Sequence, residues 1–88
     1  MSNYIFAGIR TDEETLMGAA GWGEYNERDS VQAYGQAVEQ AIIAAFPGAE
    51  VDVTTGASRT TVDSDVTTVD DITPIIELVW QAWEWLRK

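Results

Sequence analysis

The last eighteen residues, Asp71 to Lys88, constrain the fold more than any other stretch. Placed on a helix, the polar side chains form one narrow stripe. A surface helix needs an apolar arc of little more than about 100°, whereas both shoulders of this stripe are apolar as well. We therefore expect a helix that either lies in the middle of the fold or buries one shoulder against another chain. The stripe is Glu77, Gln81, Glu84 and Lys88, and the opposite core face is Ile72, Ile75, Val79, Trp83 and Leu86.

The two shoulders of this helix carry the aromatic residues that point to an interface. Ile76 and Trp80 lie on one side of the stripe, and Leu78, Ala82 and Trp85 lie on the other. A sheet beneath the core face would not easily cover both sides, and Trp is enriched at interface hot spots. The sequence therefore predicts an oligomer or partner interface made of Trp80, Trp85 and Ile76, with one of the two Trp residues exposed.

The rest of the chain predicts a single α+β domain over residues 1–88, in the order β-β-α-β-β-α. The expected strands are 3–9, 16–22, 49–54 and 59–66, and a helix capped by Asp29 or Ser30 runs to the Pro47-Gly48 stop. Strands 49–54 and 59–66 alternate in polarity and are expected to pair as a hairpin. We expect an antiparallel sheet of about four strands with both helices packed on one face, which leaves the other face solvated or available for binding.

Two local expectations concern the first half of the chain. Thr11 and Glu14 have capping-box spacing, so a single helical turn over residues 10–15 is an alternative to a turn there. Gly35 sits inside the expected helix, where glycine costs about 1 kcal/mol relative to alanine. Its expected role is to let another element approach closely.

The net charge of −10 narrows the class of partner. It opposes direct binding to nucleic acid or anionic lipid, and favours a basic partner. Acidity of this kind also serves solubility or salt adaptation. With no Cys and no signal-peptide pattern in the first residues, we expect a cytoplasmic protein, located in the host cytoplasm if a phage encodes it. An uncharged apolar run of about eighteen residues is absent, so we expect no membrane span.

Residues suited to catalysis or metal binding are scarce. The chain has no His and no Cys, and its one Lys is the last residue, so the usual bases and nucleophiles are missing. Asp63 and Asp65 are close in sequence but lack the spacing of a calcium loop. We predict no enzymatic activity, no catalytic or metal site and no cofactor.

Outward carboxylates are the stronger functional signal. Strand alternation places Glu50, Asp52, Asp63 and Asp65 on one face of the expected hairpin, with Asp70 and Asp71 close behind in the chain. Such a face can occupy a phosphate-binding groove lined with Arg and Lys. Charged edge strands that resist aggregation are the structural alternative.

In composition the chain resembles small acidic proteins of phages and mobile elements, and among those the anti-CRISPR proteins. The features behind the resemblance are the length of 88 residues, the charge of −10, the absence of His and Cys, and the acidic segment 49–66. The resemblance implies inhibition by protein–protein binding, in some members by DNA mimicry against a CRISPR effector. The first hypothesis is thus an acidic inhibitor of a basic, nucleic-acid-binding partner. The second is a homodimer or larger scaffold joined through the C-terminal helix.

Overall fold

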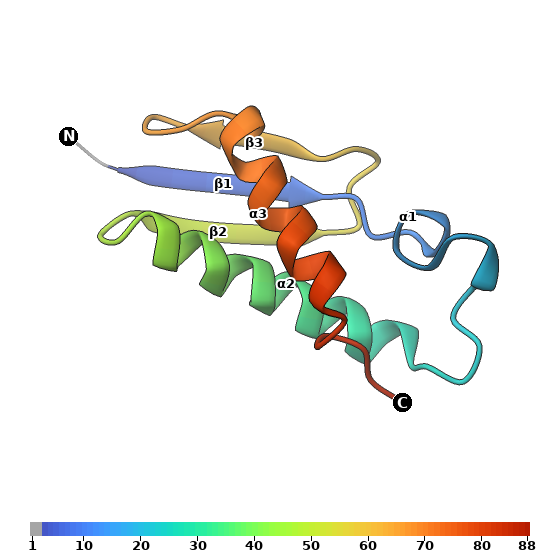
Figure 1. Cartoon of the computed structure of the whole chain (residues 1–88). Coiled ribbons are helices and arrows are strands. Elements are labelled where there is room, and N and C mark those ends of the chain that lie inside the picture. Colours follow the sequence, from blue (N-terminus) through green and yellow to red (C-terminus); the bar gives the residue numbers. More distant parts are fainter. Residues whose placement is uncertain (1–2) are drawn as a thin grey trace.

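The computed structural model describes residues 3–88, in which strands and helices are interleaved along the chain (Figure 1). In chain order the elements are β1 (Tyr4–Ile9), α1 (Glu13–Met17), the 3-10 helix η1 (Gly18–Ala20), α2 (Glu27–Ala45), β2 (Glu50–Thr55), β3 (Thr61–Ser64) and α3 (Val69–Ala82). The protein therefore has the α+β architecture expected from its sequence.

The strands form a mixed sheet in the order β2-β1-β3, and the prediction of four antiparallel strands is wrong. β1 runs parallel to β2, from the pair Tyr4↔Glu50 to the pair Ile9↔Thr55, and antiparallel to β3. Parallel neighbours need a crossover connection, which α2 supplies. The most apolar strand, β1, takes the centre, and the charged strands β2 and β3 form the edges, where charge discourages further pairing.

Both strands of the hairpin predicted over residues 49–66 are present, as β2 and β3. They do not pair with each other, because β1 lies between them. The connection from β2 to β3 is bonded to the end of β1. The Gly56 N–H donates to Thr11 Oγ1 (2.9 Å), and the Ala57 N–H donates to the Ile9 carbonyl (3.2 Å). Alternating polarity specifies the face on which a side chain lies, and it does not specify which strand is the neighbour.

The segment 16–22, predicted as a strand, contributes instead to α1 and η1. Asp12 precedes α1, and its carboxylate accepts hydrogen bonds from the Thr15 hydroxyl and the Arg10 guanidinium. Two acidic residues then occupy the first turn of α1, where the helix dipole favours them. Gly18, at φ 61°, lets the chain turn at the end of α1. The helical turn given as the alternative for residues 10–15 is thus present as α1, but Asp12 and not Thr11 is the N-cap residue, and no side chain caps the helix.

The two long helices, α2 and α3, pack on one face of the sheet, and the core lies between the helices and the sheet (Figure 1). Along β1 the alternate residues Ile5, Ala7 and Ile9 are buried, whereas Phe6 is exposed on the opposite face. α2 begins at Glu27, ahead of the predicted Asp29 or Ser30, because the Asn26 side chain caps it. The buried apolar side chains are Ile5, Ala7, Ile9, Leu16, Trp22, Tyr34, Val38, Ile42, Ile72, Ile76 and Trp85.

Gly35 lies where α2 packs closely against β2. A Cβ on Gly35 would lie 2.9 Å from Thr55 Cγ2 on β2, closer than side-chain atoms normally approach. The predicted role of this glycine is confirmed. It allows a helix and a strand to meet where a larger residue would hold them apart.

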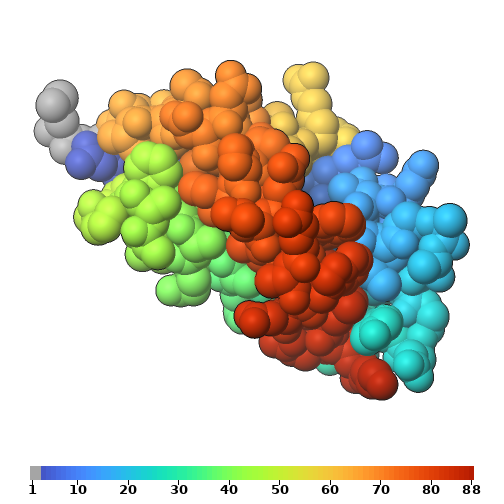
Figure 2. Space-filling model, viewed as in Figure 1, coloured from blue at the N-terminus to red at the C-terminus, as the bar shows by residue number. Residues whose placement is uncertain are grey.

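The C-terminal helix is shorter than predicted, since α3 ends at Ala82 and does not continue to Lys88. Trp83 adopts a left-handed conformation (φ 57°), and the chain then changes direction. The Asn26 N–H and the Ser30 hydroxyl both donate to the Arg87 carbonyl, at 2.7 and 3.2 Å, so the tail is fastened to the start of α2. Figure 2 shows α3 and this tail, in orange to red, lying across the molecule between α2 and the segment that follows β1.

This change of direction reverses the predicted roles of the tryptophans. Trp85 is 1% exposed and packs edge-on against Tyr34, with ring centroids 4.9 Å apart. Trp83, expected in the core, is 40% exposed. Ile72 is fully buried as predicted.

Candidate functional site

The face of the sheet opposite the helices is the candidate functional site. Its central row comes from β1, where Tyr4, Phe6 and Gly8 alternate with the buried residues. Phe6, on the central strand of the sheet, is 43% exposed on this face. We call this surface the open face; it comprises Tyr4, Phe6 and Gly8 on β1, Glu50, Asp52 and Thr54 on β2, and Thr61 and Asp63 on β3.

The strand register surrounds these aromatic rings with carboxylates. Phe6 pairs with Asp52 on one side and with Asp63 on the other, and Tyr4 pairs with Glu50. All three acidic residues are exposed. We call Glu50, Asp52 and Asp63 the acidic set. The structure thus brings together three of the carboxylates predicted to lie on one face, although β1 separates the two strands that carry them.

The acidic set forms no salt bridge within the described part of the chain. The salt bridges found in residues 3–88 join Arg10 to Asp12, Arg28 to Asp29 and Lys88 to Glu24. The negative charge of the acidic set acts on Tyr4. Asp63 beside the phenol, together with partial burial and Asp65, raises the pKa of Tyr4 above its ordinary value of 10.0. The open face therefore presents uncompensated negative charge around the exposed Phe6 and the half-buried Tyr4.

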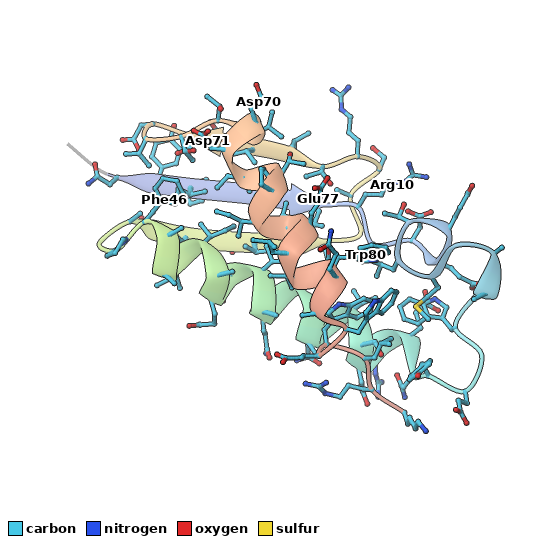
Figure 3. All side chains as sticks on the ribbon, in the orientation of Figure 1. Arg10, Phe46, Asp70, Asp71, Glu77 and Trp80 are labelled. Carbon is cyan, nitrogen blue, oxygen red and sulfur yellow. The ribbon has the colours of Figure 1, made fainter. Side chains whose placement is uncertain are left out.

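The other predicted acidic residues serve the fold. The carboxylate of Asp65 accepts a hydrogen bond from the Tyr4 N–H (2.9 Å) and so secures the start of β1. Asp70 and Asp71 lie in the first turn of α3 (Figure 3). Their negative charges interact favourably with the helix dipole at this end of the helix. Asp71 also accepts a hydrogen bond from the Thr67 hydroxyl (3.2 Å). Since α3 covers the opposite face, Asp70 and Asp71 do not extend the open face.

The interface predicted from Trp80, Trp85 and Ile76 is not a surface patch. Trp85 and Ile76 belong to the core, at 1% and 8% exposure, because the chain leaves the helical path at Trp83. Trp80 is half-buried, and its indole N–H donates to the Leu16 carbonyl (3.0 Å). Trp80 therefore joins α3 to the end of α1.

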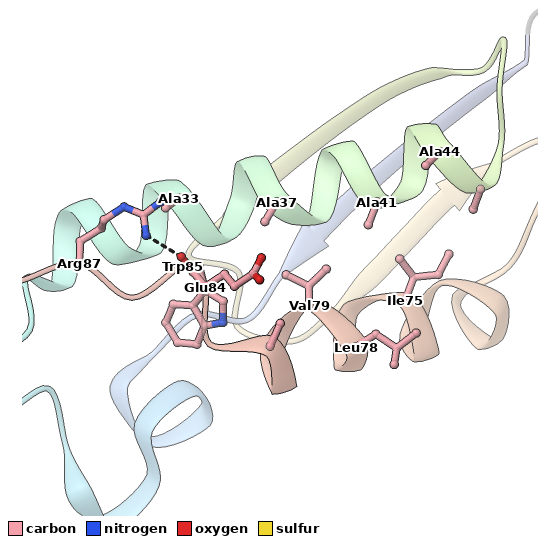
Figure 4. A pocket seen from close by; sticks show the side chains of 12 residues that line it. Ala33, Ala37, Ala41, Ala44, Ile75, Leu78, Val79, Glu84, Trp85 and Arg87 are labelled. Atoms are coloured by element: carbon pink, nitrogen blue, oxygen red, sulfur yellow. Dashed lines mark hydrogen bonds between the residues drawn. The ribbon is translucent and has the colours of Figure 1, made fainter.

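An apolar groove does lie between α2 and α3 (Figure 4). Its volume is about 740 Å³, and alanines of α2 face Ile75, Leu78 and Val79 of α3 across it. Leu78 is 68% exposed. The groove ends at Glu84 and Arg87, where the Arg87 guanidinium donates to the Glu84 carbonyl (2.6 Å).

Sequence reasoning missed Tyr4, Phe6 and Gly8 as part of the site. The apolar pattern of residues 3–9 is typical of a strand buried on both faces, or nearly so, whereas the structure buries one face of β1. In the structure, exposed acidic side chains of β2 and β3 border the outer face of β1, which the helices leave uncovered. That arrangement depends on strand order, which no local pattern in the sequence reveals.

Within residues 3–88, no cluster of three or more acidic side chains is close enough together to hold a metal ion. The helices described in this range are too short or too polar to cross a bilayer. The chain matches no protein-family model, no curated protein and no solved structure. Function is therefore argued from the geometry of the open face and of the groove.

Proposed function

We propose that this protein is a non-enzymatic binding protein that covers a basic, nucleic-acid-binding surface of another protein with its open face. One observation carries the proposal: Glu50, Asp52 and Asp63 have no ion-pair partner in the described chain and lie around the exposed Phe6 and the half-buried Tyr4, on a face that the helices leave uncovered. Aromatic anchors combined with charge that awaits a partner are typical of binding hot spots.

The cost of this arrangement to the fold supports a role in binding. The like charges of the acidic set repel one another, and no salt bridge in the described chain offsets that repulsion. Solvent-exposed Phe6 adds nothing to the core. The net charge of −10 would speed the approach of a basic partner by electrostatic steering. A CRISPR effector is one such partner, in keeping with the compositional resemblance to anti-CRISPR proteins.

The spacing of the carboxylates limits how far DNA mimicry extends. Glu50 and Asp52 stand two residues apart on β2, roughly 6.6 Å, close to the axial spacing of every second nucleotide, about 6.8 Å. Across the sheet, Asp52 and Asp63 lie two strand spacings apart, roughly 9.6 Å. The match to a nucleic-acid backbone therefore follows β2 and does not continue across the sheet.

The first prediction concerns the acidic set. A triple variant, Glu50→Gln with Asp52→Asn and Asp63→Asn, should bind immobilised oligoarginine and a guide-loaded CRISPR effector at least about ten-fold more weakly, since each exposed ion pair contributes up to about 1 kcal/mol. Biolayer interferometry measures both affinities, and release of labelled DNA from the effector measures competition.

The matched control removes the same amount of charge from α2, α3 and the C-terminal tail, away from the open face. It combines Glu39→Gln, Glu77→Gln and Glu84→Gln, and it should bind nearly as well as the wild type. Equal losses in the two variants would show that net charge alone governs binding, and the open face would then have no special role. If the wild type bound neither oligoarginine nor the effector, the proposal would be wrong.

A second candidate function is self-association through the groove between α2 and α3. The observation that favours it is the scarcity of charge along this groove in a protein of charge −10, with Leu78 protruding beside a row of alanines (Figure 4). Two copies repel each other least where their surfaces carry few charges. A symmetric dimer would place the Leu78 of each copy against the alanines of the other.

A further inference from the structure

The open face is hollowed over Gly8, beside Phe6. The hollow has a volume of about 300 Å³ and is lined by Phe6, Ala7, Gly8, Asp52, Thr54, Thr61, Val62 and Asp63. Binding sites for small molecules span about 300–1,000 Å³, so this hollow suits a single side chain. It exists because Gly8 has none. A Cβ there would stand 3.4 Å from Thr61 Oγ1 and 3.6 Å from Thr54 Oγ1, which are ordinary contacts.

One wall of the hollow is the ring of Phe6. Tyr4 and Gly8 are the residues two positions before and after Phe6, on the same face of the strand. The Tyr4 ring packs against Phe6 with centroids 5.1 Å apart. Phe6 therefore has an aromatic support on one side and the hollow on the other. A ring held in this way can receive a flat or cationic group.

The flanking walls are acidic. Asp52 and Asp63 both pair with Phe6 in the register, one from each neighbouring strand. Their backbones are separated by two strand spacings, roughly 9.6 Å. A cation seated between them would need donors that point in opposite directions. A guanidinium has five N–H donors in a plane, whereas an ammonium is a compact point charge that cannot lie flat on a ring.

We propose that the hollow binds an arginine side chain of the partner protein, with the guanidinium against Phe6 and its N–H groups donating to Asp52 and Asp63. The inference rests on the proposed function and narrows the chemistry of the partner. Charge complementarity selects the cation, and the ring with carboxylates on both sides selects arginine over lysine. A nucleic-acid ligand, which would also stack on an aromatic ring, is repelled by the same carboxylates.

The test compares acetylated tetra-arginine with tetra-lysine, titrated into the full chain by isothermal calorimetry. The wild type should prefer the arginine peptide by about two- to five-fold, the contribution expected of a cation–π contact at an exposed site. Phe6→Leu removes the ring and Gly8→Val fills the hollow. Each should bring the arginine peptide down to the affinity of the lysine peptide. The δ-methylene protons of arginine should shift upfield in NMR spectra of the wild-type complex alone.

Ile43→Leu, at an exposed apolar position on α2, is the matched control and should keep the preference. Thermal unfolding checks each variant, and if Gly8→Val does not fold, Phe6→Leu decides. Equal wild-type affinities for the two peptides, or a preference that survives Phe6→Leu, would overturn the inference. If the wild type binds the two peptides equally and the triple carboxylate variant binds both more weakly, the inference fails and the proposed function stands. No binding of either peptide would end both.

Discussion

At the residue scale, Tyr34 shows how burial of one polar group makes stability depend on pH. Its ring is 2% exposed and packs against Trp85. Burial disfavours the phenolate and raises the pKa of Tyr34 to about 12, from an ordinary value of 10.0. The group is therefore neutral in the folded protein at a pH where it ionises in the unfolded chain.

We predict that alkali destabilises the protein through Tyr34. Between pH 10 and about 12 the unfolded chain loses the phenolic proton and the folded protein retains it. The unfolded state then binds fewer protons, so the free energy of unfolding falls as pH rises. This contribution is complete below pH 10 and is lost as pH passes through the folded pKa. Urea unfolding at several pH values in this range measures the free energy of unfolding. Its decrease with pH should be smaller in Tyr34→Phe than in the wild type, and an equal decrease would contradict the assignment to Tyr34.

The acidic set and Phe6 differ in how far the sequence predicts them. Alternation along strands 49–54 and 59–66 correctly predicted that Glu50, Asp52 and Asp63 point away from the core. Phe6 lies in a strand that is apolar at both even and odd positions, so its exposure could not be inferred. Polarity patterns identify an outward charge and cannot identify an outward aromatic ring in an apolar strand.

At the scale of elements, the end of α3 is the feature that sequence patterning misplaced. Residues 71–88 have an unbroken helical periodicity, and no Gly or Pro marks a stop after Ala82. The helix ends because Trp85 gains a buried site against Tyr34 and because the Arg87 carbonyl binds the start of α2. These long-range contacts outweigh the cost of a left-handed Trp83, which is on the order of 1–2 kcal/mol.

Two substitutions distinguish this path from a continuous helix. Trp85→Ala should lower the free energy of unfolding by about 3–5 kcal/mol, as for other buried aromatic residues. Trp83→Ala should cost well under half as much, because Trp83 is 40% exposed and contacts mainly Trp80 and Trp85. Urea unfolding followed by far-UV circular dichroism measures both. A larger cost for Trp83 would mean that the helix continues and buries it.

At the scale of the whole molecule, two surfaces with opposite properties lie on opposite sides of the fold. The open face carries uncompensated charge, and the groove between α2 and α3 is lined mainly by Ala, Ile, Leu and Val. The first suits a basic partner, and the second suits a surface without charge. Both can operate in one protein, since a dimer joined at the groove would present two open faces.

If the groove joins two copies, association should strengthen with salt. Screening shortens the range of charge repulsion from about 10 Å at 0.1 M to about 3 Å at 1 M salt, whereas apolar contact at Leu78 persists. Sedimentation should show a dimer fraction that rises with sodium chloride and is lost in Leu78→Gln. Val69→Gln, at another exposed apolar position of α3, is the control. A monomer at all salt concentrations would exclude self-association and leave the open face unaffected.

Local patterns in the sequence are enough to predict the α+β class, the helix of α2 with its glycine, and the outward carboxylates of β2 and β3. These depend on local periodicity, which side-chain direction imposes wherever the chain goes. Tertiary structure decided the strand order, the path after Ala82 and the uncovered face of β1. Contacts between residues far apart in sequence, such as Gly56 to Thr11 and Arg87 to Ser30, stabilise that arrangement. Such contacts produce no periodic pattern in the sequence. They place Phe6 between two carboxylates and Trp85 in the core.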